Sequence, residues 1–280
     1  MENQCDDVLV SLAPEFPKHW ISQKLIDNGS FGQVFVVQDT NNPDEEKFIG
    51  KEISLSEVKM DKAANFVELD IMMKIKHPRI ISFYGYEKNA SKLTLFFEYI
   101  SLGSVKDCVD NNGPLPEEKI KLYTKQILEG LKYLHERNPP IIHRDIKGEN
   151  VLLKDEMNIK LTDFGLSKIV HSATQARTVA GTYNWMAPEV VSAKNKIPYD
   201  YKVDIWSLGC TVVEMATRRP PFPDLTPAKV IKALTESREP TYTLPKSASE
   251  QMRNFLELTL QINPHDRPST AELISHSFFS

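Results

Sequence analysis

The sequence predicts an α+β protein in two parts, a small part made mainly of antiparallel strands and a larger part that is mainly helical. Strand-like apolar runs separated by turn residues fill much of residues 20–53. The clearest amphipathic helix, Lys119 to Glu136, comes later in the chain. The 280 residues, 41% of them hydrophobic, also suit about two domains of roughly 150 residues each.

The first part of the chain reads as several strands and one helix. The first half-dozen residues have a composition typical of disorder, and Leu12 to Lys18 reads as a lead-in to a strand that starts near Trp20. Two strands, Ile21 to Ile26 and Gln33 to Gln38, flank a glycine turn, and a polar connection at Thr40 to Glu46 leads to a third strand at Phe48 to Ile53. A helix at Ala63 to Ile75 and a final apolar strand at Leu93 to Tyr99 follow.

The remainder reads mainly as helices. The helix over Lys119 to Glu136 carries its apolar side chains on a single stripe, formed by Ile120, Tyr123, Ile127, Leu131 and Leu134. A last helix is predicted over Ala271 to Phe279.

Charge and cysteine content narrow the classes of partner and compartment. The formal net charge is −4, from 34 basic and 38 acidic residues, and no basic run indicates a surface for nucleic acid or anionic lipid. Proteins and nucleotides are therefore the expected partners. Cys5, Cys108 and Cys210 are odd in number and far apart, which favours reduced thiols in an intracellular protein.

The chain shows no membrane or targeting signal. Its first residues are acidic where a secretory signal would be basic, and no run reaches about 18 apolar residues. Glu2 and the final Phe-Phe-Ser exclude the usual lipidation motifs. We expect a cytoplasmic protein that does not enter a membrane.

One stretch carries the groups needed for phosphate chemistry. The run His143-Arg144-Asp145-Ile146-Lys147-Gly148-Glu149-Asn150 is followed, thirteen residues after its Asn, by Asp163-Phe164-Gly165. Phosphoryl transfer requires one group that orients the attacking hydroxyl and others that hold divalent cations on the phosphates. Asp145 suits the first role, and Asn150 and Asp163 suit the second. The whole pattern resembles the signature of the protein kinase family.

The resemblance implies a two-lobed kinase fold with ATP and Mg²⁺ as cofactors. It covers about residues 18 to 279. The implied segments are an N-terminal extension over 1–17 and a kinase domain over 18–280, divided into an N-lobe at 18–96, a hinge at 97–102 and a C-lobe at 103–280. Because kinases often carry long regulatory regions, we expect a fragment, an excised domain or a minimal member.

The glycine turn is the predicted phosphate-binding loop. Gly29 and Gly32 would let backbone approach phosphates closely, although a simple hairpin turn is the alternative interpretation. Asp27 replaces the first glycine of the family pattern, and its carboxylate would repel phosphate unless it points to solvent, so weaker ATP binding is expected. The nucleotide-binding residues implied here are Ile26, Asp27, Asn28, Gly29, Ser30, Phe31, Gly32 and Val34.

Lys51 matches the family lysine that contacts the α and β phosphates, and Glu68, nine residues before His77, matches the glutamate that pairs with it. Taken alone, Lys51 could equally be a solvated strand lysine. Ile49 stands where the family has a small Ala against the adenine ring, and Gly50 would weaken the strand. These two departures motivate the hypothesis that nucleotide binding is impaired.

The resemblance places the adenine base among residues that would be apolar core in any fold. Phe97 would close the back of the pocket, and backbone groups of Glu98 and Ile100 would bond the base. Leu152 would form the floor below Val34.

Two features favour Ser or Thr as the phosphoryl acceptor. Lys147, two residues after Asp145, is typical of serine/threonine kinases and would contact the transferring phosphate. Thr182, shortly before Ala187-Pro188-Glu189, resembles the threonine that bonds the base and the lysine in this class. Dual specificity remains open.

The segment from Asp163 to Glu189 resembles an activation loop. Thr178 is the preferred phosphorylation site and Thr174 the second, with Arg144 as the partner of the phosphate. Apart from Thr178 and Thr182, each hydroxyl residue here reads better as an ordinary polar loop residue.

Two further motifs resemble structural parts of kinases. Asp204, in Asp204-Ile205-Trp206-Ser207-Leu208-Gly209, resembles the residue that anchors the catalytic loop, and Arg267 resembles the partner of Glu189.

The runs Gly148 to Leu152, Gly181 to Glu189 and Gly209 to Thr217 are similar to mitogen-activated protein kinase kinase kinases and the Ste20-like group. This implies a mitogen-activated protein kinase kinase as substrate, and an upstream kinase or self-phosphorylation at Thr178 as activator. The rival hypothesis is a pseudokinase scaffold, motivated by Asp27, Ile49 and Gly50. A nucleotide hydrolase without a protein substrate is a third alternative, but the chain lacks the P-loop pattern that most such proteins use.

Overall fold

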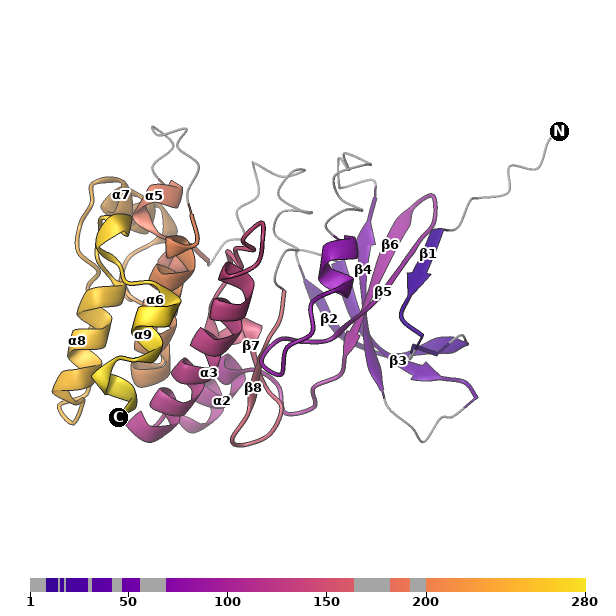
Figure 1. Cartoon of the computed structure of the whole chain (residues 1–280), viewed down its shortest axis with the longest axis horizontal. Coiled ribbons are helices and arrows are strands. Elements are labelled where there is room, and N and C mark those ends of the chain that lie inside the picture. Colours follow the sequence, from indigo (N-terminus) through magenta and orange to yellow (C-terminus); the bar gives the residue numbers. More distant parts are fainter. Residues whose placement is uncertain are drawn as a thin grey trace. The chain divides into compact units, whose positions relative to one another are not determined.

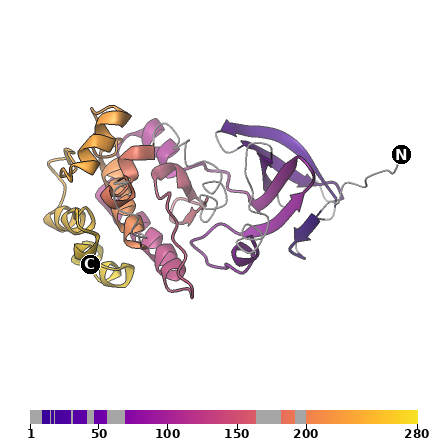
Figure 2. The ribbon, with the colours of Figure 1, turned by 90° about the horizontal axis from the view of Figure 1, so that it is seen from above.

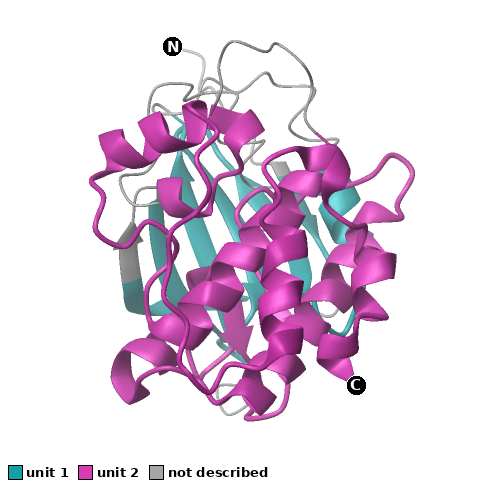
Figure 3. Cartoon of the chain, turned by 90° about the vertical axis from the view of Figure 1, so that its left-hand side faces the viewer, with its two compact units in different colours: residues 1–99, 168–176 teal, residues 100–167, 177–280 magenta. Residues whose placement is uncertain are grey.

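A computed structural model describes residues 9–14, 16–17, 19–29, 32–41, 47–55, 69–163, 182–191 and 200–280. The chain divides after Tyr99 into two compact units, which Figure 3 shows in teal and magenta. The predicted combination of an antiparallel sheet in the first unit and helices in the second is confirmed. Within the described residues, no helix is both long and apolar enough to cross a membrane.

The first unit contains a six-stranded antiparallel sheet in the order β1-β5-β6-β4-β3-β2. Figures 1 and 2 show this sheet from two directions. Its strands are β1 (Leu9–Leu12), β2 (Trp20–Gly29), β3 (Gly32–Asp39), β4 (Phe48–Ser54), β5 (Phe83–Lys88) and β6 (Lys92–Glu98). Residues 69–73 are helical and belong to the predicted helix over 63–75, whose start lies outside the described residues. The hairpin of β2 and β3 is longer than predicted, because pairing continues to Gly29 opposite Gly32.

Strand β1 was not predicted, since its segment stands before the expected lead-in and is only four residues long. It pairs with β5 from Leu9 opposite Lys88 to Leu12 opposite Gly85. Gly85 has φ 126°, and a Cβ there would lie 2.1 Å from the Ser11 carbonyl oxygen, so only glycine permits this approach of β1. Long-range pairing therefore creates a strand that the local pattern does not reveal.

An aromatic cluster fills one face of the sheet. Phe16 is buried, and its ring centroid lies 4.4 Å from that of Phe96 and 5.0 Å from that of Phe48. Gly50 is buried in the middle of β4, where a Cβ would lie 2.4 Å from the ring of Phe35. Gly50 thus makes room for the Phe35 ring, which gives this glycine a packing role that sequence analysis did not find.

The second unit is mainly helical. It contains α2 (Val105–Asn112), α3 (Glu117–His135), α5 (Pro188–Val191), α6 (Lys202–Thr217), α7 (Pro227–Thr235), α8 (Glu250–Thr259) and α9 (Thr270–Ile274), with short 3₁₀ turns at η1 (Gly148–Asn150), η2 (Thr182–Trp185), η3 (Pro264–Asp266) and η4 (Ser277–Phe279). A small antiparallel sheet joins β7 (Val151–Leu153) to β8 (Ile159–Leu161). Helix α3 lies close to its predicted range, and all five side chains of its predicted stripe are buried.

The last helix is shorter than predicted. Sequence analysis expected one helix from Ala271 to Phe279, but α9 ends at Ile274 and η4 follows. The His276 ring nitrogen Nδ1 accepts a hydrogen bond from the Phe278 backbone at 3.0 Å, which caps the new turn. This turn directs Phe278 into the core, with its ring 5.3 Å from that of Phe255.

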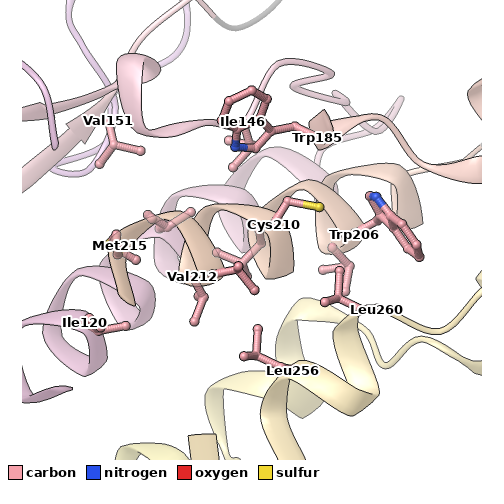
Figure 4. Packing of buried hydrophobic residues seen from close by; sticks show 14 of the residues in the cluster. Ile120, Ile146, Val151, Trp185, Trp206, Cys210, Val212, Met215, Leu256 and Leu260 are labelled. Carbon is pink, nitrogen blue, oxygen red and sulfur yellow. The ribbon is translucent and has the colours of Figure 1, made fainter. Parts of the chain in front are cut away.

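Helix α6 is the centre of the second unit. Every residue from Val203 to Ala216 is buried, as expected for a helix covered on all sides. Figure 4 shows its side chains between Ile146 and Trp185 on one side and Leu256 and Leu260 on the other. Four buried side chains of α6 are polar, namely Asp204, Ser207, Thr211 and Glu214. Each needs a polar partner, because an unpaired buried polar group is unfavourable.

Candidate functional site

Residues 143–150, called the 143–150 loop below, bring together three of the predicted site residues. The Asn150 side-chain amide donates to the Asp145 carbonyl and to its carboxylate oxygen Oδ2, both at 2.7 Å. Lys147 Nζ lies 3.6 Å from the same Oδ2 and 3.0 Å from the Glu149 carboxylate. The loop thus fixes the Asp145 carboxylate between an amide and an ammonium group.

Asp204 of α6 anchors the start of this loop, as predicted. Its buried carboxylate accepts hydrogen bonds from the backbone N–H groups of His143 and Arg144, each at 2.8 Å. It also lies 2.8 Å from His135 Nε2. Burial alone would raise the pKa of Asp204, but these hydrogen bonds and the nearby imidazoles lower it below its usual range. The anchor is therefore an ionised carboxylate.

Arg144 shows how firmly this anchor holds the backbone. Its φ is 69°, in the left-handed region that non-glycine residues rarely adopt. Such strain persists where the surrounding contacts determine the conformation, and it is concentrated at functional sites. The hydrogen bond from Arg144 N to Asp204 is one such contact.

Asp163, two residues after the end of β8, is brought next to the loop by backbone pairing. Val151 pairs with Leu161, and the Thr162 N–H donates to the Asn150 carbonyl at 3.0 Å. Asp163 also has a positive φ of 61°. The structure therefore places Asn150 and Asp163 in adjoining segments that a backbone hydrogen bond joins.

These two residues suit a Mg²⁺ ion that is held partly by phosphate. The amide hydrogens of Asn150 bond Asp145, which leaves its carbonyl oxygen as the donor atom for a cation, and Asp163 adds a carboxylate. Mg²⁺ is usually held by one or two carboxylates together with phosphates and waters. In the part of the chain that the structure describes, no group of three or more His, Cys, Asp or Glu could hold a metal by itself. The donor set thus fits Mg²⁺ bound together with ATP.

Burial and neighbouring charges shift the pKa values of Lys147 and His143 in the loop. Burial opposes the charge of Lys147, but Asp145 and Glu149 outweigh it and raise the pKa of Lys147, which stays protonated. Burial lowers the pKa of His143, against the opposing effect of Asp204 and Asp145. Lys147 thus places a protonated ammonium group beside Asp145.

The first unit holds the predicted phosphate lysine and the glycine turn. Lys51 lies in β4, opposite Val34 of β3, and is buried. Gly32 has φ 114°, and a Cβ there would lie 1.8 Å from the Glu52 carbonyl oxygen, so this position requires glycine.

Part of the glycine turn lies outside the described residues. Only the backbone of Asp27, Asn28 and Gly29 is described, as the end of β2, whereas the Ile26 side chain is 48% exposed. The remaining predicted site and loop residues outside the description are Ser30, Phe31, Glu68, Phe164, Gly165, Thr174 and Thr178.

The predicted adenine-binding residues are divided between the units. Glu98 ends β6 in the first unit, and its backbone N–H donates to the Ser82 carbonyl at 2.9 Å. Ile100 and Leu152 belong to the second unit and are half-buried. Leu152 lies in β7 and forms a β-bridge with Ser104. The contacts predicted between these residues and the adenine base stay predictions.

The predicted pairing of Arg267 with Glu189 is confirmed. The two guanidinium NH groups donate to the two carboxylate oxygens at 2.7 and 2.9 Å. The other donors of Arg267 bond the carbonyls of Gln261, Ile262 and Lys202. The pair joins α5, which contains Glu189, to Arg267, which directly follows η3.

Sequence analysis assigned no role to Glu214 or to Trp185. The buried Glu214 carboxylate accepts hydrogen bonds from the backbone N–H of Gly148 and from the indole N–H of Trp185. The available signal was a glutamate inside the apolar run from Cys210 to Ala216, which is rare unless the charge is paired.

Comparisons with known proteins agree with this geometry. A family model described as the protein kinase domain matches residues 20–279. The chain is 38% identical over 282 residues to mitogen-activated protein kinase kinase kinase 3 of Mus musculus and of Homo sapiens, which covers 95% of this chain and 43% of each relative. It is 36% identical over 263 residues to mitogen-activated protein kinase kinase kinase YODA of Arabidopsis thaliana, covering 92% of this chain and 29% of that protein.

The chain spans less than half of the length of these relatives. The family match, in contrast, includes almost all of the chain and every described element from β2 to η4. The chain belongs to the protein kinase family.

Proposed function

We propose that this chain is a protein serine/threonine kinase that transfers the γ-phosphoryl group of Mg-ATP to Ser or Thr hydroxyls. The observation that carries the proposal is the arrangement of the 143–150 loop, where Asn150 and Lys147 hold the Asp145 carboxylate from two sides. Catalysis by positioning and electrostatics is what phosphoryl transfer requires of the protein.

Each group of the loop has a distinct task in this proposal. Asp145 accepts the hydroxyl proton of the substrate and orients its oxygen. The Asn150 amide keeps the carboxylate in place, while Lys147 supplies positive charge for the transferring group. When bound, Mg-ATP supplies the phosphoryl group, and Asn150 with Asp163 would hold the metal.

We further propose that the substrate is a mitogen-activated protein kinase kinase. The support is the names of the three relatives described above and their identity to this chain, since each of them is named as a mitogen-activated protein kinase kinase kinase. Phosphorylation at Thr178, by an upstream kinase or by the chain itself, and a cytoplasmic location belong to the same proposal. The comparisons give no support to a pseudokinase, and the packing of Gly50 against Phe35 explains one of the departures that motivated it.

The test is phosphoryl transfer from labelled ATP with Mg²⁺ to a generic Ser/Thr substrate, to the chain itself and to a mitogen-activated protein kinase kinase. Wild type is compared with Asp145→Asn, which keeps the shape of the side chain but removes the carboxylate. Activity that is lost in the variant supports the proposal. If wild type neither transfers phosphate nor binds ATP after activator or phosphatase pretreatment, the scaffold hypothesis replaces the kinase.

A further inference from the structure

Helix α6 contacts the 143–150 loop at two points, and only the first was predicted. Asp204, near the start of the helix, accepts the N–H groups of His143 and Arg144. Glu214, near the end of the helix, accepts the Gly148 N–H at 2.9 Å. Asp145 and Lys147 lie between these two points in the chain. Both of these contacts with the segment are therefore made by buried acidic side chains of a single helix.

The dimensions of the two segments match. Ten residues of α-helix separate Asp204 from Glu214, a rise of about 15 Å. The four Cα–Cα steps from Arg144 to Gly148 span at most about 14 Å when fully extended. Lys147 has φ −163° and ψ 164°, which is nearly full extension. The backbone is thus extended at Lys147, directly before the Gly148 anchor, whereas Arg144, with φ 69°, is not extended. Loss of the Gly148 anchor would free the end of the loop next to Lys147.

The Gly148 anchor is closely packed. A Cβ on Gly148 would lie 2.8 Å from Glu214 Oε2 and 3.1 Å from its Cδ, so the carboxyl group fills the space beside this glycine. Glu214 is 1% exposed, and in the described part of the chain its other oxygen, Oε1, is buried without a hydrogen-bond partner. The carboxyl group is shielded from bulk solvent, and Glu214 is the acceptor that the structure gives the Gly148 N–H.

The same carboxylate also bonds Trp185, which lies within the segment from Asp163 to Glu189 that resembles an activation loop. The Trp185 indole N–H lies 3.3 Å from Glu214 Oε2, and Ser207 of α6 donates to the Trp185 carbonyl at 2.8 Å. Trp185 ends η2, just before the segment of Glu189. Glu214 therefore joins the end of the 143–150 loop to the segment at Trp185.

We propose that Glu214 is a positioning residue for phosphoryl transfer, which acts through the Gly148 N–H to hold Asp145 and Lys147 in place. This inference rests on the proposed kinase function. Glu214 itself touches neither the substrate nor the nucleotide in this scheme. A displacement of the reacting groups by about 1 Å can lower a rate roughly 100-fold, so the loss of one anchor should be measurable in turnover.

The test compares three variants. Glu214→Leu keeps a side chain of similar size but removes the hydrogen-bond acceptor. Glu214→Gln keeps an acceptor oxygen without the charge. Thr211→Val is the matched control, because Thr211 is buried in the same helix and bonds only the Ser207 carbonyl, at 2.8 Å, among the hydrogen bonds described for it. It perturbs α6 without touching the loop.

Two readouts keep the inference separate from the proposed function. The first is hydrogen–deuterium exchange of the peptide that contains Gly148, which requires no activity. Glu214→Leu should speed this exchange at least about tenfold, whereas Thr211→Val and Glu214→Gln should leave it near the wild-type rate. The second is steady-state kinetics, in which Glu214→Leu should lower kcat by about 10- to 100-fold, with the KM for ATP within about twofold of wild type.

The inference is overturned if Glu214→Leu exchanges like wild type, or if its kcat falls no further than that of Thr211→Val. It is also overturned if Glu214→Gln fails as completely as Glu214→Leu, because the acceptor oxygen would then not be the relevant feature. An inactive wild type with fast exchange in Glu214→Leu would refute the kinase proposal alone, while the anchoring of Gly148 would stand.

Discussion

Replacement of Arg267 by Met should destabilise the second unit far more than loss of a surface charge. The Arg267 side chain is 0% exposed and donates to both oxygens of Glu189 and to three backbone carbonyls. Breaking a buried ion pair by removing one partner costs about 3–5 kcal/mol. Because the Glu189 side chain is 20% exposed and can regain some water, we expect a value near 3 kcal/mol. That is a large part of a total stability of about 5–15 kcal/mol.

The double variant Arg267→Met with Glu189→Leu separates the charge from the hydrogen bonds. It removes both charges, and apolar replacement of a buried pair is often neutral or stabilising. The carbonyls of Gln261, Ile262 and Lys202 still lose their donor, so the double variant should remain below wild type but above the single Arg267→Met variant.

Urea unfolding followed by tryptophan fluorescence measures these differences. The Arg267 guanidinium lies 5.1 Å from the ring centroid of Trp206, so this fluorophore reports on the unit that is perturbed. Arg219→Met is the control, since the pair of Arg219 with Asp224 is 58% and 85% exposed and should contribute close to nothing. The reasoning is refuted if Arg267→Met shifts the midpoint no more than Arg219→Met does, or if the double variant is less stable than the single one.

Three further predictions concern the site and its support. Asp145→Asn should abolish most turnover with nearly unchanged ATP affinity, whereas Asp163→Asn should weaken Mg-ATP binding itself; equal losses of affinity in calorimetry would contradict this division of roles. Burial raises the pKa of Glu214 from 4.5 to about 7, so the folded state keeps a proton that the unfolded chain releases. The free energy of unfolding should therefore fall by up to about 3 kcal/mol as the pH rises from about 4.5 to 7, and Glu214→Gln should remove this fall in pH-resolved unfolding curves. Gly50→Ala should destabilise the first unit by about 1–3 kcal/mol, because its Cβ would overlap the Phe35 ring, and Phe35→Leu should relieve that loss in thermal unfolding.

Local patterns predicted the elements of this protein better than its long-range contacts. The helix at α3 follows from its apolar stripe, all of which is buried in the structure. Strand β1 depends on pairing with β5, more than seventy residues away, which four residues of sequence cannot indicate. The break between α9 and η4 likewise depends on the pocket that receives Phe278.

In the candidate site, too, residues close in sequence were easier to predict than contacts between distant segments. The spacing of Asp145, Asn150 and Asp163 led directly to the roles proposed for them. The anchor at Asp204 lies about sixty positions from the loop and was predicted only through resemblance to the kinase family. Glu214, equally distant, had no such support. Its only signal was a charge in an apolar helix, which shows that a partner exists but not which backbone group it is.

The two carboxylates of α6 differ because they have different numbers of donors. Asp204 accepts two backbone N–H groups and lies beside His135, so its pKa falls although it is fully buried. Glu214 has two donors on one oxygen and none on the other, so burial dominates and its pKa rises. Of the neighbouring charges, Lys106 of α2 lowers the pKa of Glu214 and Glu149 of the loop raises it. The start of the 143–150 loop is consequently held by a permanent charge, whereas its end is held by a group that gains or loses a proton near neutral pH.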